Sequence, residues 1–238
     1  MMDQIPVVLR VEDYKLEELL RCPEHFAKSK SGRKQKSDVN WRQMVQFAAS
    51  HCVNDFYGLP EGGRTQDAIE ASVEHWWTNR NYKFHSDEHF LQMKQTVKEQ
   101  LSSFLLGGAC PRTPIIFYEQ LTAYVEELDL ELSQIFHLVA ADPDGGADDY
   151  IVQKLAVDVD EDALGLLFHM TSVFCMSAFE KLPTRIEVLS LLSGKKVVYV
   201  PDEESLEGSY DYMYLIKSLL PEADVFKVNP GSSFQFVM

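Results

Sequence analysis

The chain has 238 residues, with 37 acidic and 22 basic side chains, so its formal net charge at neutral pH is −15. Proteins that bind nucleic acid mainly through phosphates need a surplus of Lys and Arg, so this balance predicts weak non-specific affinity for DNA. No uncharged apolar run approaches the roughly 20 residues that cross a bilayer, and no membrane contact is expected. Four widely spaced cysteines indicate free thiols in a reducing compartment, so we expect a cytoplasmic protein.

The first half of the chain is predicted to be largely helical. Apolar residues recur at helical spacing over residues 11–27 and 40–57, and Gly58 and Pro60 are expected to stop the second of these helices. Two further helices are expected over residues 65–79 and 86–106.

A polar, basic stretch separates the first two predicted helices. It contains Lys30, Arg33, Lys34 and Lys36, and its composition is typical of a loop. Two interpretations stay open for it. The four side chains either lie in a solvated loop or contact phosphates of DNA.

The second half changes to strands. Alternation and turn residues predict the following elements: strands over residues 114–127, 129–141 and 150–157, a buried helix over 160–179, a hairpin of 185–192 with 195–200, and a last helix over 205–220. Together with the first half, this order predicts an α/β fold with a mixed central sheet flanked by helices. We expect one domain spanning residues 1–238, with residues 60–110 as a helical insertion or subdomain.

Three features carry a resemblance to a known family. Residues 14–26 read YKLEELLRCPEHF, His51 lies in the second predicted helix, and residues 151–156 form the strand IVQKLA after a long hairpin. This order resembles the RecB-type branch of the PD-(D/E)XK nucleases, which includes the CRISPR-associated exonucleases that carry an iron–sulfur cluster. The resemblance extends from Tyr14 to about Gly231 and implies a restriction-endonuclease-like core.

The resemblance also implies where catalytic groups belong. Such enzymes hold Mg²⁺ or Mn²⁺ with carboxylates on adjacent strands and place a lysine beside them. In this chain Phe136 stands at the metal-binding aspartate, while Gln153 and Leu155 stand at the carboxylate and lysine of the next strand. His137 is adjacent but is expected on the opposite face of its strand. These replacements predict a catalytically inactive protein.

Some pieces of such a site remain. His51 matches the histidine that this branch places beside the metals, and Glu119 matches an acidic residue on the strand that opens the hairpin. Asp149 and Lys154 could be a migrated carboxylate and a migrated lysine, although Lys154 is expected to face away from its strand neighbours. The alternative hypothesis is therefore a Mg²⁺- or Mn²⁺-dependent DNA exonuclease with a site rebuilt from these four residues. His51 and Glu119 are equally consistent with an ordinary partly buried histidine and an exposed strand residue.

The cysteines of the iron–sulfur site are mostly missing. Relatives with the cluster use one cysteine of a Cys-Pro pair and three near the C-terminus, and only Cys22 is retained here. Residues such as Ser233 and Phe236 fill the other positions. One thiolate cannot hold a cluster that needs four ligands, so neither a cluster nor another cofactor is expected.

The leading hypothesis is a non-catalytic interaction or scaffolding protein of a DNA repair, recombination or defence assembly, with a protein as its partner. A third hypothesis discards the resemblance and treats the chain as an α/β module that binds a protein through Trp76, Trp77 and nearby helices. Such a pair of rings usually places one in the core and one at the surface or in a partner contact.

Overall fold

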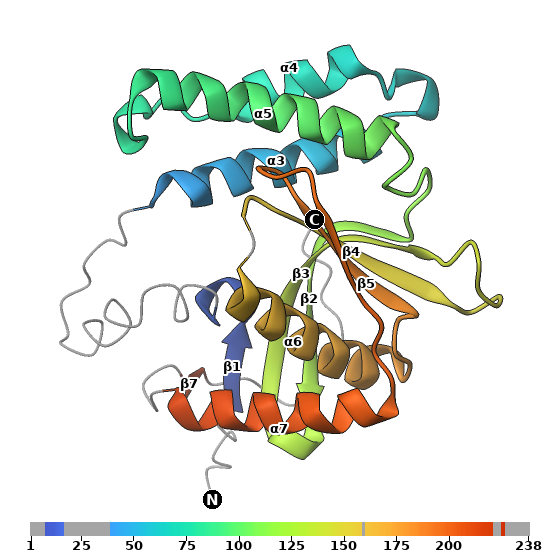
Figure 1. The fold of residues 1–238 in the computed structure, drawn as a ribbon. Helices are drawn as coiled ribbons and strands as arrows, with labels where there is room; N and C mark the ends of the chain where they lie inside the picture. The colour runs from blue at the N-terminus through green and yellow to red at the C-terminus, as the bar shows by residue number, and fades with distance from the viewer. Residues whose placement is uncertain (1–7, 17–38, 159, 221–224, 227–238) are drawn as a thin grey trace, which may run out of the picture.

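The computed structural model describes residues 8–16, 39–158, 160–220 and 225–226. Its elements in the first half are β1 (Val8–Glu12), α3 (Trp41–Gly58), η1 (Glu61–Gly63), α4 (Gln66–Trp76), η2 (Asn81–Lys83) and α5 (Asp87–Leu106). The second half contains β2 (Ile116–Val125), η3 (Glu126–Leu128), β3 (Leu130–Ala141), β4 (Tyr150–Ala156), α6 (Glu161–Phe179), β5 (Arg185–Ser190), β6 (Lys196–Tyr199), α7 (Glu203–Leu219) and β7 (Val225–Phe226). The fold is α/β with a mixed sheet flanked by helices, as predicted (Figure 1).

The helices of the first half begin at capping residues. Asn40 forms a capping box with Gln43 at the start of α3. Thr65 and Ser86 accept hydrogen bonds from the third backbone amides of α4 and α5, respectively. These caps confirm the predicted starts of the three helices, although α4 ends at Trp76, before the predicted end at residue 79. Because they satisfy amides that have no partner inside the helix, the starting points are set by the local sequence.

The sheet has seven strands in the order β6-β5-β4-β3-β1-β7, with β2 on the other edge of β3. β2 and β3 form the antiparallel hairpin. On its opposite edge, β3 pairs first with β1 in parallel, up to Ser133, and from Leu138 onward with β4 in antiparallel. On this edge of β3, residues 134–137 therefore lie between the end of the pairing with β1 and the start of the pairing with β4. We call this place, beside residues 134–137 of β3, the fork.

Helices cover both faces of the sheet. α3 lies on one face with α4 and α5 outside it, and α6 and α7 lie on the other (Figure 1). On the α3 side, Val45, Ala49 and Val53 share a core with Leu138 and Leu155 of the sheet. Residues of α4 and α5 belong to this same core, so the segment predicted as an insertion or subdomain packs directly onto α3.

The first predicted helix needs a correction. Residues 11 and 12 end the strand β1, and the helix begins at Asp13, whose Oδ1 accepts a hydrogen bond from the Tyr14 amide at 2.8 Å. Pairing with β3 satisfies the backbone of residues 9–12, which outweighs their helical spacing. The rest of this predicted helix with Cys22, the basic residues Lys30, Arg33, Lys34 and Lys36, and the tail with Ser233 and Phe236 lie outside the described residues.

α6 is strongly apolar, as its sequence indicates. Within the described ranges it is the one helix that could cross a membrane by length and composition, with 19 residues and a mean hydropathy of 1.4. In the structure α6 packs between the sheet and α7, and Met170, Val173 and Phe174 are buried. An apolar helix is expected in this position because both of its long sides meet protein.

Candidate functional site

β3 changes the face of its side chains at the position where a nuclease would carry its aspartate. Phe136 points to the α6 side, where its ring lies 5.1 Å from that of Phe174. His137 points to the α3 side, as predicted, and its Nε2 lies 2.9 Å from Ser50 Oγ of α3. Leu138 also belongs to the α3-side core. Two consecutive residues therefore share one face, so the regular alternation of a strand is broken here.

β2 breaks its alternation opposite this point. Tyr118 has a φ of 44°, a left-handed conformation that is uncommon for residues other than glycine. The rings of Phe117 and Tyr118 both face α3, at 5.9 Å from Tyr57 and 5.2 Å from His51, respectively. Such a backbone costs on the order of 1–3 kcal/mol and persists where surrounding contacts hold it. Here the ring contacts with α3 provide that support.

This break separates Glu119 from His51. Glu119 pairs with Phe136 in the antiparallel ladder, and directly opposed residues share a face of the sheet. Glu119 therefore lies on the α6 side, whereas His51 belongs to α3 on the other side. Glu119 makes no hydrogen bond or ion pair with any other described residue. The structure does not bring these two predicted site residues together.

The three expected catalytic positions lie inside the protein. Phe136, Gln153 and Leu155 are 1%, 2% and 0% exposed. Leu155 packs in the α3-side core. The Gln153 amide donates to the Ala109 carbonyl at 2.8 Å and to Glu187 Oε2 at 2.6 Å. All three side chains are used for packing or internal hydrogen bonding, so a substrate cannot reach them.

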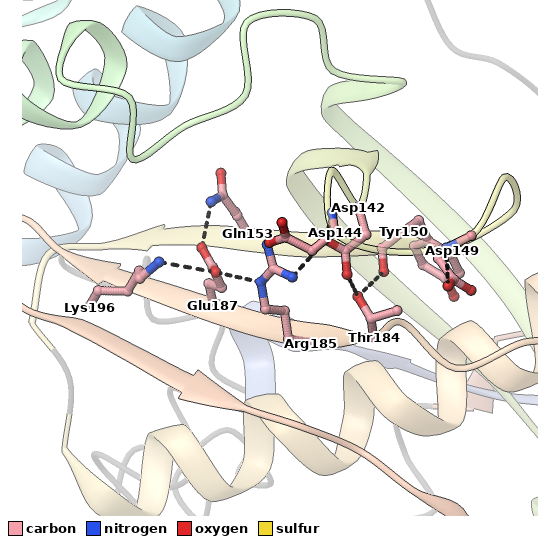
Figure 2. A network of polar contacts seen from close by, with 10 residues as sticks. Asp142, Asp144, Asp149, Tyr150, Gln153, Thr184, Arg185, Glu187 and Lys196 are labelled. Atoms are coloured by element: carbon pink, nitrogen blue, oxygen red, sulfur yellow. Dashed lines mark hydrogen bonds and ion pairs between the residues drawn. The ribbon is translucent and has the colours of Figure 1, made fainter.

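Glu187 is the centre of a polar network along β4 and β5 (Figure 2). Its buried carboxylate accepts hydrogen bonds from Gln153, from Arg185 Nε at 2.9 Å and from Lys196 Nζ at 3.1 Å. Burial acts to raise the pKa of Glu187, but these hydrogen bonds outweigh it and hold the pKa below its ordinary value. Arg185 also donates to Asp142 at 2.8 Å. The network thus holds an ionised carboxylate inside the sheet.

Asp149 belongs to the turn at the other end of β4. Its carboxylate accepts a hydrogen bond from Lys181 at 2.7 Å and another from the Gly146 amide at 2.6 Å, and these bonds lower its pKa. Lys154 lies five residues further along the chain, which corresponds to about 17 Å of extended strand. Asp149 therefore stabilises the turn and does not meet Lys154.

Lys154 finds a different carboxylate at the fork. Its Nζ lies 2.9 Å from Asp13 Oδ2, and the same oxygen accepts a hydrogen bond from the Ile135 amide at 3.2 Å. Asp13 thereby fills the gap between β1 and β4. Asp13 is not among the predicted site residues, because the helical spacing of residues 11–27 places it inside a helix. The available signal was that Asp is a favoured residue at the start of a helix.

Beside the fork, α3 is attached to β4 by polar contacts. Gln46 donates to the Leu155 carbonyl at 2.8 Å and accepts from the Val157 amide at 3.0 Å, so its amide continues the ladder. His137 is fully buried, and its Nδ1 has no partner among the described residues. Burial, with the positive charge of Lys154, lowers the pKa of His137 to about 3, so its ring is neutral at physiological pH.

His51 lies in a group of rings that we call the aromatic cluster: Phe47, His51, Trp76 and Tyr118. The His51 ring stacks on Trp76 with 4.1 Å between centroids, and Phe47 lies 4.2 Å from His51. Asp55 Oδ2 accepts a hydrogen bond from Trp76 Nε1 at 2.7 Å, which fixes the indole. Burial lowers the pKa of His51 more than the nearby Asp55 raises it.

The aromatic cluster is partly open to solvent. Phe47 is 52% exposed, whereas Trp77, the neighbour of Trp76, is 9% exposed and packs in the core. Trp77 packs in the core, and Trp76 is partly buried against the same core, so neither indole of the pair lies fully at the surface. Large rings held in fixed orientations are well suited to contacts with another protein.

The geometry offers little to a metal ion. Of the four residues of the rearranged site, Glu119 lies on the other side of the sheet from His51, and Asp149 does not meet Lys154. Across residues 8–16, 39–158, 160–220 and 225–226 no group of three or more His, Cys, Asp and Glu side chains is placed to hold a metal ion. Cys52, Cys110 and Cys175 are free and buried, and burial raises the pKa of each thiol to about 12.

Compared with known proteins, the chain matches no family model and no curated protein.

Proposed function

We propose that this chain is a catalytically inactive, nuclease-like protein that acts through protein contacts in a DNA repair, recombination or defence assembly. One observation carries the proposal. The three positions where the resemblance places two carboxylates and a lysine hold Phe136, Gln153 and Leu155, which are buried in the cores or bonded to internal partners. A hydrated metal ion and a phosphodiester could not replace these contacts without opening the protein.

The order of the elements supports the nuclease-like part of the proposal. A helix precedes three antiparallel-connected strands, β2, β3 and β4, and α6 then crosses over to β5, which is parallel to β4. This order is compatible with the restriction-endonuclease-like core that the resemblance implies. The fork at residues 134–137 adjoins the positions where such enzymes carry their metal ligands.

Charge and redox chemistry support the other parts. A net charge of −15 repels phosphates, so protein contacts are favoured over DNA contacts. The aromatic cluster offers rigid, partly exposed rings for such contacts. Three buried thiols without disulfides suit a reducing compartment, so we place the protein in the cytoplasm.

The proposal is tested with the full-length protein, single- and double-stranded DNA, and Mg²⁺ or Mn²⁺. We expect no cleavage above a blank preparation, and no heat of Mn²⁺ binding in calorimetry. Lys154→Met and Glu119→Gln are the matched variants, since each removes one group of the alternative site without changing the three buried positions. Metal-dependent cleavage by the wild-type protein that either variant abolishes would show that the protein is an enzyme and that the proposal is wrong.

A further inference from the structure

α7 has one side that no described part of the protein covers. Its inner side buries Ser209, Met213 and Ile216 against α6 and η3. The outer side carries a row of exposed residues spaced four apart: Glu203, Glu207, Asp211, Leu215 and Leu219. Residues four apart on a helix are neighbours, so this row is a continuous stripe. We call this stripe, together with the adjacent Tyr214, the α7 outer face.

The two halves of the α7 outer face differ in chemistry. The first half carries the acidic residues, and none of them forms an ion pair with another described residue. The second half is apolar, with Tyr214, Leu215 and Leu219 at 63%, 57% and 64% exposed. Glu203 lies in the first turn, where a carboxylate stabilises the helix dipole. Glu207 and Asp211 lie beyond it, and like charges four apart destabilise a helix by a few tenths of a kcal/mol. Helix stability therefore does not explain the stripe.

Further acidic groups lie close to other side chains of α7. Asp162 of α6 lies close enough to Tyr212 to add to the effect of burial in raising its pKa. Glu127 of η3 acts in the same direction on Tyr210, where burial is again the larger cause. The nearby cation Lys217 donates to the backbone carbonyls of Leu128 and Asp129, at 2.6 and 3.2 Å, and so is occupied within the protein. Acidic groups of α6 and η3 thus also lie beside α7, next to the partly buried Tyr212 and Tyr210.

We propose that the α7 outer face binds a basic amphipathic segment of a partner protein. Its apolar side chains would cover Tyr214, Leu215 and Leu219, and its Lys or Arg side chains would pair with Glu207 and Asp211. A charge-complementary partner of this kind neutralises carboxylates that form no ion pair with any described residue. A second copy is a poor occupant because each copy carries a charge of −15, and a twofold antiparallel pair of α7 helices would cover carboxylates with leucines.

The inference rests on the proposed role in protein contacts, but the two fail separately. DNA cleavage would contradict that role without affecting peptide binding. Absence of peptide binding would contradict only the proposal that the α7 outer face is a binding site. The probe is a labelled 18-residue helical peptide of Leu, Ala and Lys, with leucines along one side and lysines beside them. One control peptide has Glu in place of Lys, and another has Ala in place of Leu. Fluorescence anisotropy with the full-length protein should give 1:1 binding of the first peptide only.

Paired variants locate the binding site. Glu207→Lys with Asp211→Lys should weaken binding by about tenfold or more. Leu215→Ser with Leu219→Ser should weaken it by about tenfold. The matched control for the charge change is Asp67→Lys with Glu88→Lys. The control for the loss of exposed apolar side chains is Tyr82→Ser with Leu91→Ser. Both control pairs should bind within about twofold of the wild type, apart from a small general effect of net charge.

Hydrogen exchange provides a readout that does not depend on substitutions. Peptide binding should protect the amides of α7 and leave those of α4 and α5 unchanged. Equal losses in the Asp67 and Glu88 control would show that net charge alone attracts the peptide, and the proposal would be wrong. Protection elsewhere than α7, or self-association of the protein through α7 in sedimentation, would overturn it as well.

Discussion

The two faces of the central sheet bury different kinds of side chain. On the α6 side, Phe136 and its neighbours form an almost wholly apolar core, in which Gln134 is bonded to Thr171 of α6 at 2.6 Å. The α3 side buries His137, Gln153 and Glu187 among its apolar residues. These groups are bonded to the elements around them and so hold α3, β4 and β5 together. The α3 side thus buries titratable and polar groups, but these groups form their hydrogen bonds within the protein.

This difference determines which side chain position 136 can accommodate. An ionised Asp at position 136 would have to be buried among the rings of α6, at a high desolvation cost. Phe136 instead adds to the core, while the neighbouring His137 satisfies Ser50. Whether a strand residue serves chemistry or packing therefore depends on the face to which its backbone turns it.

The largest expected effect is on the apolar face. Phe136→Ala should lower the free energy of unfolding by about 3–5 kcal/mol, because it leaves a cavity beside Phe174. Urea denaturation followed by fluorescence measures this change. Phe117→Ala, at a position that is 36% exposed, is the control and should cost less than about half as much. Similar losses at both positions would mean that the α6-side core does not depend on Phe136.

The next effect concerns the charged network of the α3 side. Glu187→Ala should lower the free energy of unfolding by about 3 kcal/mol, because it leaves Arg185 and Gln153 without their partner inside the sheet. Glu187→Gln keeps the volume and one acceptor oxygen, so its loss should be clearly smaller. If the Ala and Gln variants unfold at the same urea concentration, the hydrogen bonds of Glu187 contribute little.

The pH dependence of stability provides a test of the buried histidine on the α3 side. The pKa of His137 is about 3 in the folded protein and about 6.5 in an unfolded chain, so between these values only the unfolded chain binds the proton. Stability should therefore fall as the pH falls from 6.5 toward 3, by up to about 1.4 kcal/mol per pH unit from this group. Carboxylates contribute to the same decline in stability, but His137→Gln removes the contribution of this one imidazole. Urea midpoints between pH 7 and 4.5 should show a shallower decline for the variant, and equal slopes would contradict the buried neutral ring.

The smallest effect is expected where α6 ends. Glu180 has a φ of 55° at the C-cap, a conformation that glycine adopts without steric cost. Glu180→Gly should therefore raise the free energy of unfolding by about 1 kcal/mol. Glu207→Gly, in the middle of α7, is the control and should lower it by about the same amount. A loss of stability at both positions would show that the left-handed conformation of Glu180 does not cost stability.

Much of the fold was predictable from local patterns. Asn40, Thr65 and Ser86 marked the starts of helices because their side chains satisfy free amides within a few residues. The Asp-Pro-Asp-Gly-Gly sequence marked the turn between β3 and β4 for the same kind of local reason. β1 was missed because its five residues carry little local signal, and their partner strand lies about 120 positions later in the chain.

The candidate site likewise has features that the sequence predicts and features that depend on contacts between distant segments. Side-chain chemistry alone showed that Phe136, Gln153 and Leu155 cannot supply two carboxylates and a lysine. Only the tertiary structure decided that Lys154 meets Asp13, that Gln153 meets Glu187, and that the left-handed Tyr118 turns Glu119 away from His51. A sequence pattern records what a segment satisfies by itself, such as a cap, a turn or an alternating face. Contacts between distant segments depend on which strands pair and how the cores pack, and these are properties of the whole chain.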